Sequence, residues 1–246
     1  MTQDSRQEFQ VRFGPATKPG IPSDQERGTI RANRYAARVA GVLFITATAS
    51  TMGAQTILAS LLDGAPEADA IQRHLFALVV LLELANALAS AGIAIAFYPV
   101  LRRLAETAAT GYLGLRIIEG AVGVVAAAAL AMILFMGPSG PAVALELHEA
   151  AFLMVLIVFS IGTLLLYPVL FAFRLVPQVL SLWGLIGGLM LLVSCGLILF
   201  GRIEVGGRVD LILSLPIWIN EMVLALWLLI RGLDPAAINQ KKTHVH

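Results

Sequence analysis

Six polar residues lie inside segments that are otherwise apolar enough for a lipid bilayer. A charge near the middle of a bilayer costs about 2.5–3.5 kcal/mol even on the lenient insertion scale. We therefore expect these side chains to face the interior of a helical bundle, toward one another or toward a wet cavity, and not toward lipid. They are three carboxylates, two amides and one guanidinium: Glu83, Glu119, Glu221, Asn86, Asn220 and Arg116.

The spacing of these residues predicts which side chains can meet. Arg116 and Glu119 are three positions apart, so they share one face of a helix and can pair within it. Glu83, Asn86 and Ser90 share one face of an earlier helix by the same rule. One arginine is outnumbered by three glutamates, and burial disfavours the charged form of a carboxyl. At least one of the three is therefore expected to hold a proton.

Three functions are compatible with such a cluster, and the residues alone do not assign a catalytic group. The polar pocket near the bilayer midplane could bind or move a small ligand or a proton. A protonated glutamate could instead act as a general acid on a lipid-like substrate, such as an isoprenoid. The cluster could also be an interhelical lock in a structural or accessory subunit. We favour the first function, with all six residues as the site, because intramembrane ionisable groups usually mark functional sites.

No metal and no cofactor is predicted. The sequence contains no HExxH, no GxSxG and no glycine-rich phosphate loop, and its single cysteine, Cys195, lies in an apolar run. His148, flanked by Glu146 and Glu149, is a weak candidate for binding a cation, and we expect it to be solvated at the membrane boundary. A net charge of +1 gives no indication of nucleic-acid binding.

The composition is that of an integral membrane protein. Of the 246 residues, 58% are hydrophobic and 13% are charged, and the mean hydropathy is +0.84, whereas soluble domains carry roughly 25% charged residues. Crossing a bilayer takes about 20 predominantly apolar residues, and six segments qualify: 37–62, 75–101, 112–136, 150–173, 178–200 and 210–230. The connections 63–74 and 137–149 are candidates for short interfacial helices.

These segments predict an all-α, polytopic six-helix bundle in the cell (plasma) membrane. The membrane domain is expected over 34–233, with a disordered cytoplasmic tail over 1–33 and a short polar C-terminal tail over 234–246. Most of the 17 Lys and Arg residues fall on the side of the N-terminus. This bias predicts that both termini are cytoplasmic. The basic residues expected on the outer side are only Arg73, Arg202 and Arg208.

Small residues predict where the helices meet. Gly120 and Gly123, and the pair Gly184 and Gly188, are spaced for close approach of two backbones. Pro216 is expected to kink the last helix. We expect a compact monomer in the lipid bilayer, with a homodimer through the Gly184–Gly188 face as the alternative. The expected ligand is small and either hydrophobic or cationic.

Four motifs in this order resemble a bacterial membrane family catalogued as domain of unknown function 4386. They are ELANALASAGIAIAFYPVLRR from Glu83, LRIIEG around Arg116, RLVPQVLSLWGLIGG from Arg174 and NEMVLALWLLIRG from Asn220. The resemblance covers about residues 34–233 and implies a six- or seven-helix bundle without an established activity. It also implies that the family's acidic and basic positions correspond to Glu83, Arg116, Glu119 and Glu221. This chain departs from the family by having Phe171, Ala172 and Phe173 where a Tyr–basic–Ser stretch is usual.

Overall fold

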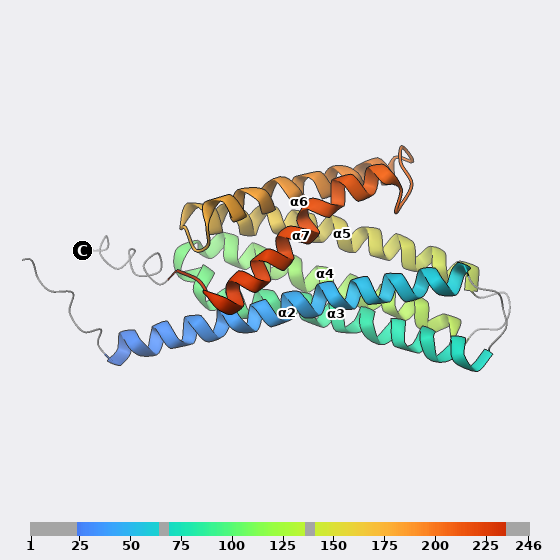
Figure 1. Ribbon diagram of the computed structural model, residues 1–246, viewed down its shortest axis with the longest axis horizontal. Coiled ribbons are helices and arrows are strands. Elements are labelled where there is room, and N and C mark those ends of the chain that lie inside the picture. The colour runs from blue at the N-terminus through green and yellow to red at the C-terminus, as the bar shows by residue number, and fades with distance from the viewer. Residues whose placement is uncertain (1–23, 64–68, 136–140, 235–246) are drawn as a thin grey trace, which may run out of the picture. The chain divides into compact units, whose positions relative to one another are not determined.

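The computed structural model describes residues 24–63, 69–135 and 141–234 of the chain, and these form six α-helices. All six are long and apolar enough to cross a membrane, and the described residues include no strand. The all-α fold of a multi-pass membrane protein is therefore confirmed. The helices, shown in Figure 1, are α2 (Asp24–Asp63), α3 (Asp69–Leu104), α4 (Glu106–Ile133), α5 (Pro141–Ala172), α6 (Gln178–Leu199) and α7 (Arg208–Ile230).

Four helices, α2 to α5, begin at least six residues earlier than the hydropathy pattern indicates; α4 begins at Glu106 and not at residue 112. α2 begins at Asp24, inside the segment 1–33 predicted to be a disordered tail, and residues 1–23 lie outside the described part. α3 and α5 begin at Asp69 and Pro141 and take up most of the connections predicted to hold separate interfacial helices. Extending an existing helix adds one hydrogen bond per residue, whereas a separate short helix would need a new nucleus.

His148 is the clearest consequence of these longer helices. Because α5 begins at Pro141, His148 lies two turns inside the helix, where it is only 2% exposed. Its Nδ1 lies 3.3 Å from the carbonyl oxygen of Ala126 in α4, and its ring stacks on Phe152 at 6.0 Å. The expectation that His148 is solvated at the membrane boundary is therefore wrong.

Consecutive helices from α3 to α7 pack against one another, and α2 packs against both α3 and α7. At the contact with α7, a Cβ atom added to Gly41 of α2 would lie 2.9 Å from the carbonyl oxygen of Ala225. At the contact with α3, a Cβ atom on Gly92 would lie 3.0 Å from Leu43. Glycine at these two positions lets the helix backbones approach closely, as expected for association in lipid.

The predicted glycine pair of α6 faces another helix of the same chain. A Cβ atom on Gly184 would collide with the ring of Tyr167, and one on Gly188 would collide with Thr163, both in α5. This surface is therefore occupied within the monomer and is not available for the predicted homodimer contact. Gly120 likewise faces α3, where its Cβ would lie 2.8 Å from the carbonyl oxygen of Ala87.

Pro216 lies inside α7, and Figure 1 shows that this helix changes direction partway along its length. A proline inside a helix removes one backbone hydrogen bond and clashes with the preceding turn, which bends the helix. The first half of α7 follows α6, and the second half crosses α2. Glu221 lies just after the bend, so the bend helps to bring its carboxylate to the other helices.

Candidate functional site: a charged cavity between five helices

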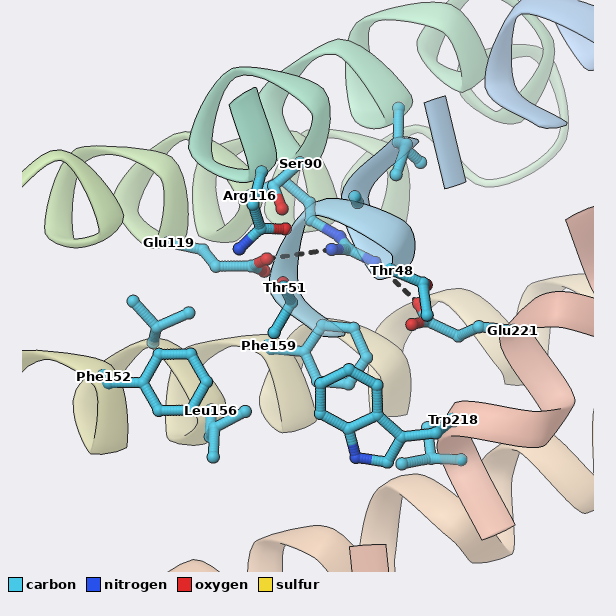
Figure 2. Close-up of a pocket in the computed structure, with 15 residues that line it drawn as sticks. Thr48, Thr51, Ser90, Arg116, Glu119, Phe152, Leu156, Phe159, Trp218 and Glu221 are labelled. Carbon is cyan, nitrogen blue, oxygen red and sulfur yellow. Dashed lines mark hydrogen bonds and ion pairs between the residues drawn. The ribbon is translucent and has the colours of Figure 1, made fainter. Parts of the chain in front are cut away.

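A cavity of about 40 Å³ lies between five of the six described helices, with α6 alone contributing nothing to its wall. A water molecule needs roughly 10–15 Å³ of such volume. The cavity therefore has room for about two to four water molecules or a ligand of similar size. Its polar lining, drawn in Figure 2, comprises Thr48 and Thr51 of α2, Asn86 and Ser90 of α3, Arg116 and Glu119 of α4, and Glu221 of α7.

Arg116 lies between two carboxylates, as Figure 2 shows. Its Nη1 donates to Glu119 Oε1 at 3.0 Å within α4, and its Nη2 lies 3.7 Å from Glu221 Oε1 on α7. The first contact is the predicted pair at positions i and i+3. The second joins α7 to α4 through charge. Arg116 is 2% exposed, so both contacts are removed from solvent.

Aromatic rings enclose the remaining faces of the Arg116 guanidinium. Its central carbon lies 4.9 Å from the ring centre of Phe159, 5.4 Å from that of Tyr112 and 5.9 Å from that of Phe44. The Nε of Arg116 also donates to the Tyr112 hydroxyl at 3.1 Å. Aromatic faces attract cations electrostatically, and more strongly when both are desolvated. The rings therefore stabilise the arginine and hold it in one orientation.

Two oxygen atoms of the cavity wall are buried without a hydrogen-bond partner among the described residues: Thr48 Oγ1 and Glu119 Oε2. Buried polar groups almost always find a partner in protein or ordered water, and an unmade hydrogen bond of this kind costs about 1–3 kcal/mol. Both atoms belong to residues that line a space large enough for water. A polar guest in the cavity would provide the missing hydrogen bonds.

The opposite wall of the cavity is apolar. It is formed by Phe152, Leu156 and Phe159 of α5 and by Trp218 of α7, below the charged group in Figure 2. The cavity therefore has a charged group on one side and aromatic rings on the other, and one of these rings, Phe159, already faces the Arg116 guanidinium.

Four of the six predicted site residues line this cavity: Asn86, Arg116, Glu119 and Glu221. Glu83 is buried, at 2% exposure, but does not line it. A helix rises 1.5 Å per residue, so Glu83 lies about 4.5 Å from Asn86 and about 10 Å from Ser90 along α3. Its Oε1 has no hydrogen-bond partner among the described residues, and the same is true of Gln55 Nε2 in the neighbouring helix α2.

Asn220 also lies outside the cavity, where both ends of its amide are already engaged. Its Oδ1 accepts from the Tyr167 hydroxyl of α5 at 2.6 Å, and its Nδ2 donates to the carbonyl oxygen of Leu180 in α6 at 2.9 Å. Asn220 and Tyr167 are at most 1% exposed. This arrangement gives Asn220 a structural task, because it ties α5, α6 and α7 together.

Sequence reasoning missed most of the neutral residues that surround the Arg116 guanidinium or line the cavity. Tyr112 could have been found, because it stands four positions before Arg116 and therefore shares its helix face. Thr48 and Thr51 are spaced on one face of an apolar helix, which is a weaker signal. Phe44 and Phe159 lie on other helices, and only the packing brings them to the guanidinium.

Among the described residues, no three His, Cys, Asp or Glu side chains lie close enough together to hold a metal ion. Cys195 is buried, and within the described part it forms no disulfide. The chemistry available in the cavity is therefore that of carboxylates, a guanidinium, hydroxyls and an amide. Such groups bind cations and water and exchange protons.

Comparison with known proteins gives one match. A family described as "Domain of unknown function (DUF4386)" matches residues 39–232, which include all five cavity-forming helices in whole or in part. Neither the curated proteins nor the solved structures include one that is significantly similar to this chain.

Proposed function

The chain belongs to this family of unknown function, and we propose from its cavity that it binds a proton or a small cation inside the membrane. The binding group is the triad of Arg116, Glu119 and Glu221. We further propose that the membrane is the plasma membrane, with both termini in the cytoplasm.

The observation that carries the proposal is the unpartnered carboxylate oxygen of Glu119. Its other oxygen is held by Arg116 at 3.0 Å, so the carboxylate is fixed in position, and Oε2 is the oxygen left without a partner. Two carboxylates share one guanidinium, so the group attracts one further positive charge. A bound proton or ammonium-sized ion would supply that charge.

The size of the cavity favours this function over an enzyme acting on lipid. A volume of about 40 Å³ takes a few water molecules or an ion and is far too small for an isoprenoid chain. An interhelical lock remains the competing explanation, because Arg116 also joins α4 to α7.

Trp218 offers a direct test, because it lines the cavity and the chain has only three tryptophans. Replacing Trp183 and Trp227 by Phe leaves Trp218 as the single fluorescent reporter. We expect its emission to change saturably when the purified protein is titrated with methylammonium, and to change again when the pH is varied.

The same titration should separate a binding site from a lock. Glu119→Gln and Glu221→Gln keep the shape of each side chain but remove a charge, so each should abolish the methylammonium response while the protein stays folded. Glu106→Gln, at the exposed start of α4, is the matched control and should respond like the parent protein. If all three variants are folded and none differs from the parent, the charged group is architecture and the proposal fails.

A further inference from the structure

A second cavity, of about 460 Å³, lies where α5 ends, α6 begins and α7 ends. It is some ten times larger than the first cavity and lies at the ends of three membrane-spanning helices, not in their middle. In a bilayer spanned by these helices, a cavity at their ends would lie toward the lipid headgroups of one leaflet. The wall is formed by residues 174–178 before and at the start of α6, and by Trp227 and residues 231–234 at the end of α7.

Arginine dominates the charge of this second cavity. Arg174 and Arg231 line it, and the central carbon of Arg231 lies 5.7 Å from the ring centre of Trp227. Arg34 of α2 is close by, since its Cγ would lie 3.9 Å from a Cβ atom on Gly232. Asp234 is the one carboxylate among the described residues of the wall. Positive charge therefore exceeds negative charge around the cavity.

Arg174 occupies a backbone position that favours glycine. It has φ +50°, in the left-handed region, and it follows the last turn of α5. Gly232 has φ +74° and ends α7 in the same way on the same cavity. Helices commonly end in a left-handed residue, and it is usually glycine, because other side chains are disfavoured there. Arg174 therefore occupies a position at which any side chain carries a conformational cost.

The start of α6 adds further donors to the wall. Gln178 is the first residue of this helix and lines the cavity, and no side chain caps the helix end. The first backbone N–H groups of a helix have no partner within it and favour anions. These donors complement the two arginines but would not define a site without them.

We propose that the second cavity binds the phosphate group of an anionic phospholipid. Arginine forms two parallel hydrogen bonds with phosphate oxygens, and two arginines line the wall. Tryptophan is typical of the membrane interface, and Trp227 beside Arg231 fits contact with the glycerol region of a lipid. A soluble phosphate ester would offer the same chemistry, so the source of the phosphate has to be tested.

The test compares melting temperatures of the purified protein in a neutral detergent with added phosphatidylglycerol, phosphatidylcholine or glycerol phosphate. We expect phosphatidylglycerol to raise the melting temperature by several degrees and phosphatidylcholine to have little effect. A shift with phosphatidylglycerol alone identifies a lipid, and a further shift with glycerol phosphate identifies a soluble ester as an alternative source. Equal shifts with both lipids, or no shift with any additive, would overturn the proposal.

Arg174→Gly and Arg231→Gln should each reduce the shift caused by phosphatidylglycerol, and the double variant should lose it. Without lipid, Arg174→Gly should melt at the same temperature as the parent or higher, since glycine suits a positive φ. This keeps loss of binding distinct from loss of folding. Arg102→Gln is the matched control: Arg102 lies in the last turn of α3, and its guanidinium carbon lies 5.7 Å from the ring centre of Tyr98, but it does not line the cavity. If the double variant keeps the shift, or Arg102→Gln loses it, the cavity is not the binding site.

Discussion

Arg116 combines the features that make a buried charge hard to replace. Two carboxylates, one hydroxyl and three aromatic rings surround its guanidinium. Lysine would keep the charge but could not replace these contacts, since an ammonium lacks the planar group of fixed N–H donors that a guanidinium offers. Removing one partner of a buried ion pair costs about 3–5 kcal/mol, because the other charge is left uncompensated.

Arg116→Leu should therefore destabilise the protein by about 3–5 kcal/mol. Equilibrium unfolding of the variant and the parent protein in detergent would measure this difference. Arg116→Leu with Glu119→Leu should recover only part of this loss, because Glu221, 3.7 Å from the arginine, still lacks a partner. Adding Glu221→Leu should recover most of the remainder. If the double and triple variants melt no higher than Arg116→Leu, the three residues do not act as one group.

Tyr167→Phe tests the buried tie made by Asn220. The change removes the hydroxyl that donates to Asn220 Oδ1 at 2.6 Å, so the amide oxygen loses a buried partner at a cost of about 1–3 kcal/mol. The control is Tyr98→Phe, because Tyr98, like Tyr167, is followed by Pro-Val-Leu in its helix, and among the described residues no side-chain hydrogen bond is found for it. The melting temperature should fall for Tyr167→Phe and stay near that of the parent for Tyr98→Phe. Equal changes in melting temperature for the two variants would show that the Tyr167–Asn220 hydrogen bond does not contribute to stability.

The spacing of residues along one helix predicted which side chains meet within that helix. It did not predict most contacts between side chains of different helices. The Arg116–Glu119 pair follows from three-residue spacing and is present. The approach of Glu221 depends on the bend at Pro216 and on the packing of α7, and the separation of Glu83 from the cavity depends on the register of α3. Sequence could place these carboxylates at similar depth but could not determine which of them meet.

At the scale of helices, apolar length correctly predicted six membrane-spanning segments, and small residues correctly marked close contacts. The errors are mainly at the helix starts, where polar residues extend α2, α3, α4 and α5 beyond the apolar segments. Hydropathy marks the part of each helix that is apolar enough for lipid. The backbone hydrogen bonds of the helix continue beyond that part. Glycine spacing predicted that two helices meet at Gly184 and Gly188, but not whether the partner belonged to the same chain.

The α5–α6 contact yields a prediction with a control in the same helix. In an exposed helix Ala is favoured over Gly by about 1 kcal/mol, and Gly196 has nothing within 4 Å of an added Cβ, so Gly196→Ala should be neutral or stabilising. At Gly184 the same change would collide with the Tyr167 ring, which Asn220 holds in place, and overpacking costs about 1–3 kcal/mol. Gly184→Ala should therefore lower the melting temperature. A rise in both variants would mean that the two helices are not tightly packed at Gly184.

At the scale of the whole molecule, the two cavities lie at different depths. The small charged cavity lies between the middle parts of five helices, and the larger arginine-lined cavity lies at helix ends. The ends of α3, α5 and α7 fall on the same side of the membrane, because successive spans alternate in direction. The basic residues Arg102, Arg103, Arg174 and Arg231 are on this side. An orientation with this side in the cytoplasm would present the larger cavity to the inner leaflet, where anionic lipids attract basic residues.

Labelling of single cysteines in intact cells would establish this orientation. The background is Cys195→Ala, since Cys195 is the only native cysteine. Thr107→Cys lies at the exposed start of α4, and Val205→Cys lies in the exposed turn between α6 and α7, at the opposite ends of the spans. An excess of Lys and Arg marks the cytoplasmic side, so a membrane-impermeant thiol reagent should label Val205→Cys in intact cells and Thr107→Cys only after permeabilisation. The reverse pattern would place the arginine-lined cavity in the outer leaflet and contradict the cytoplasmic assignment of both termini.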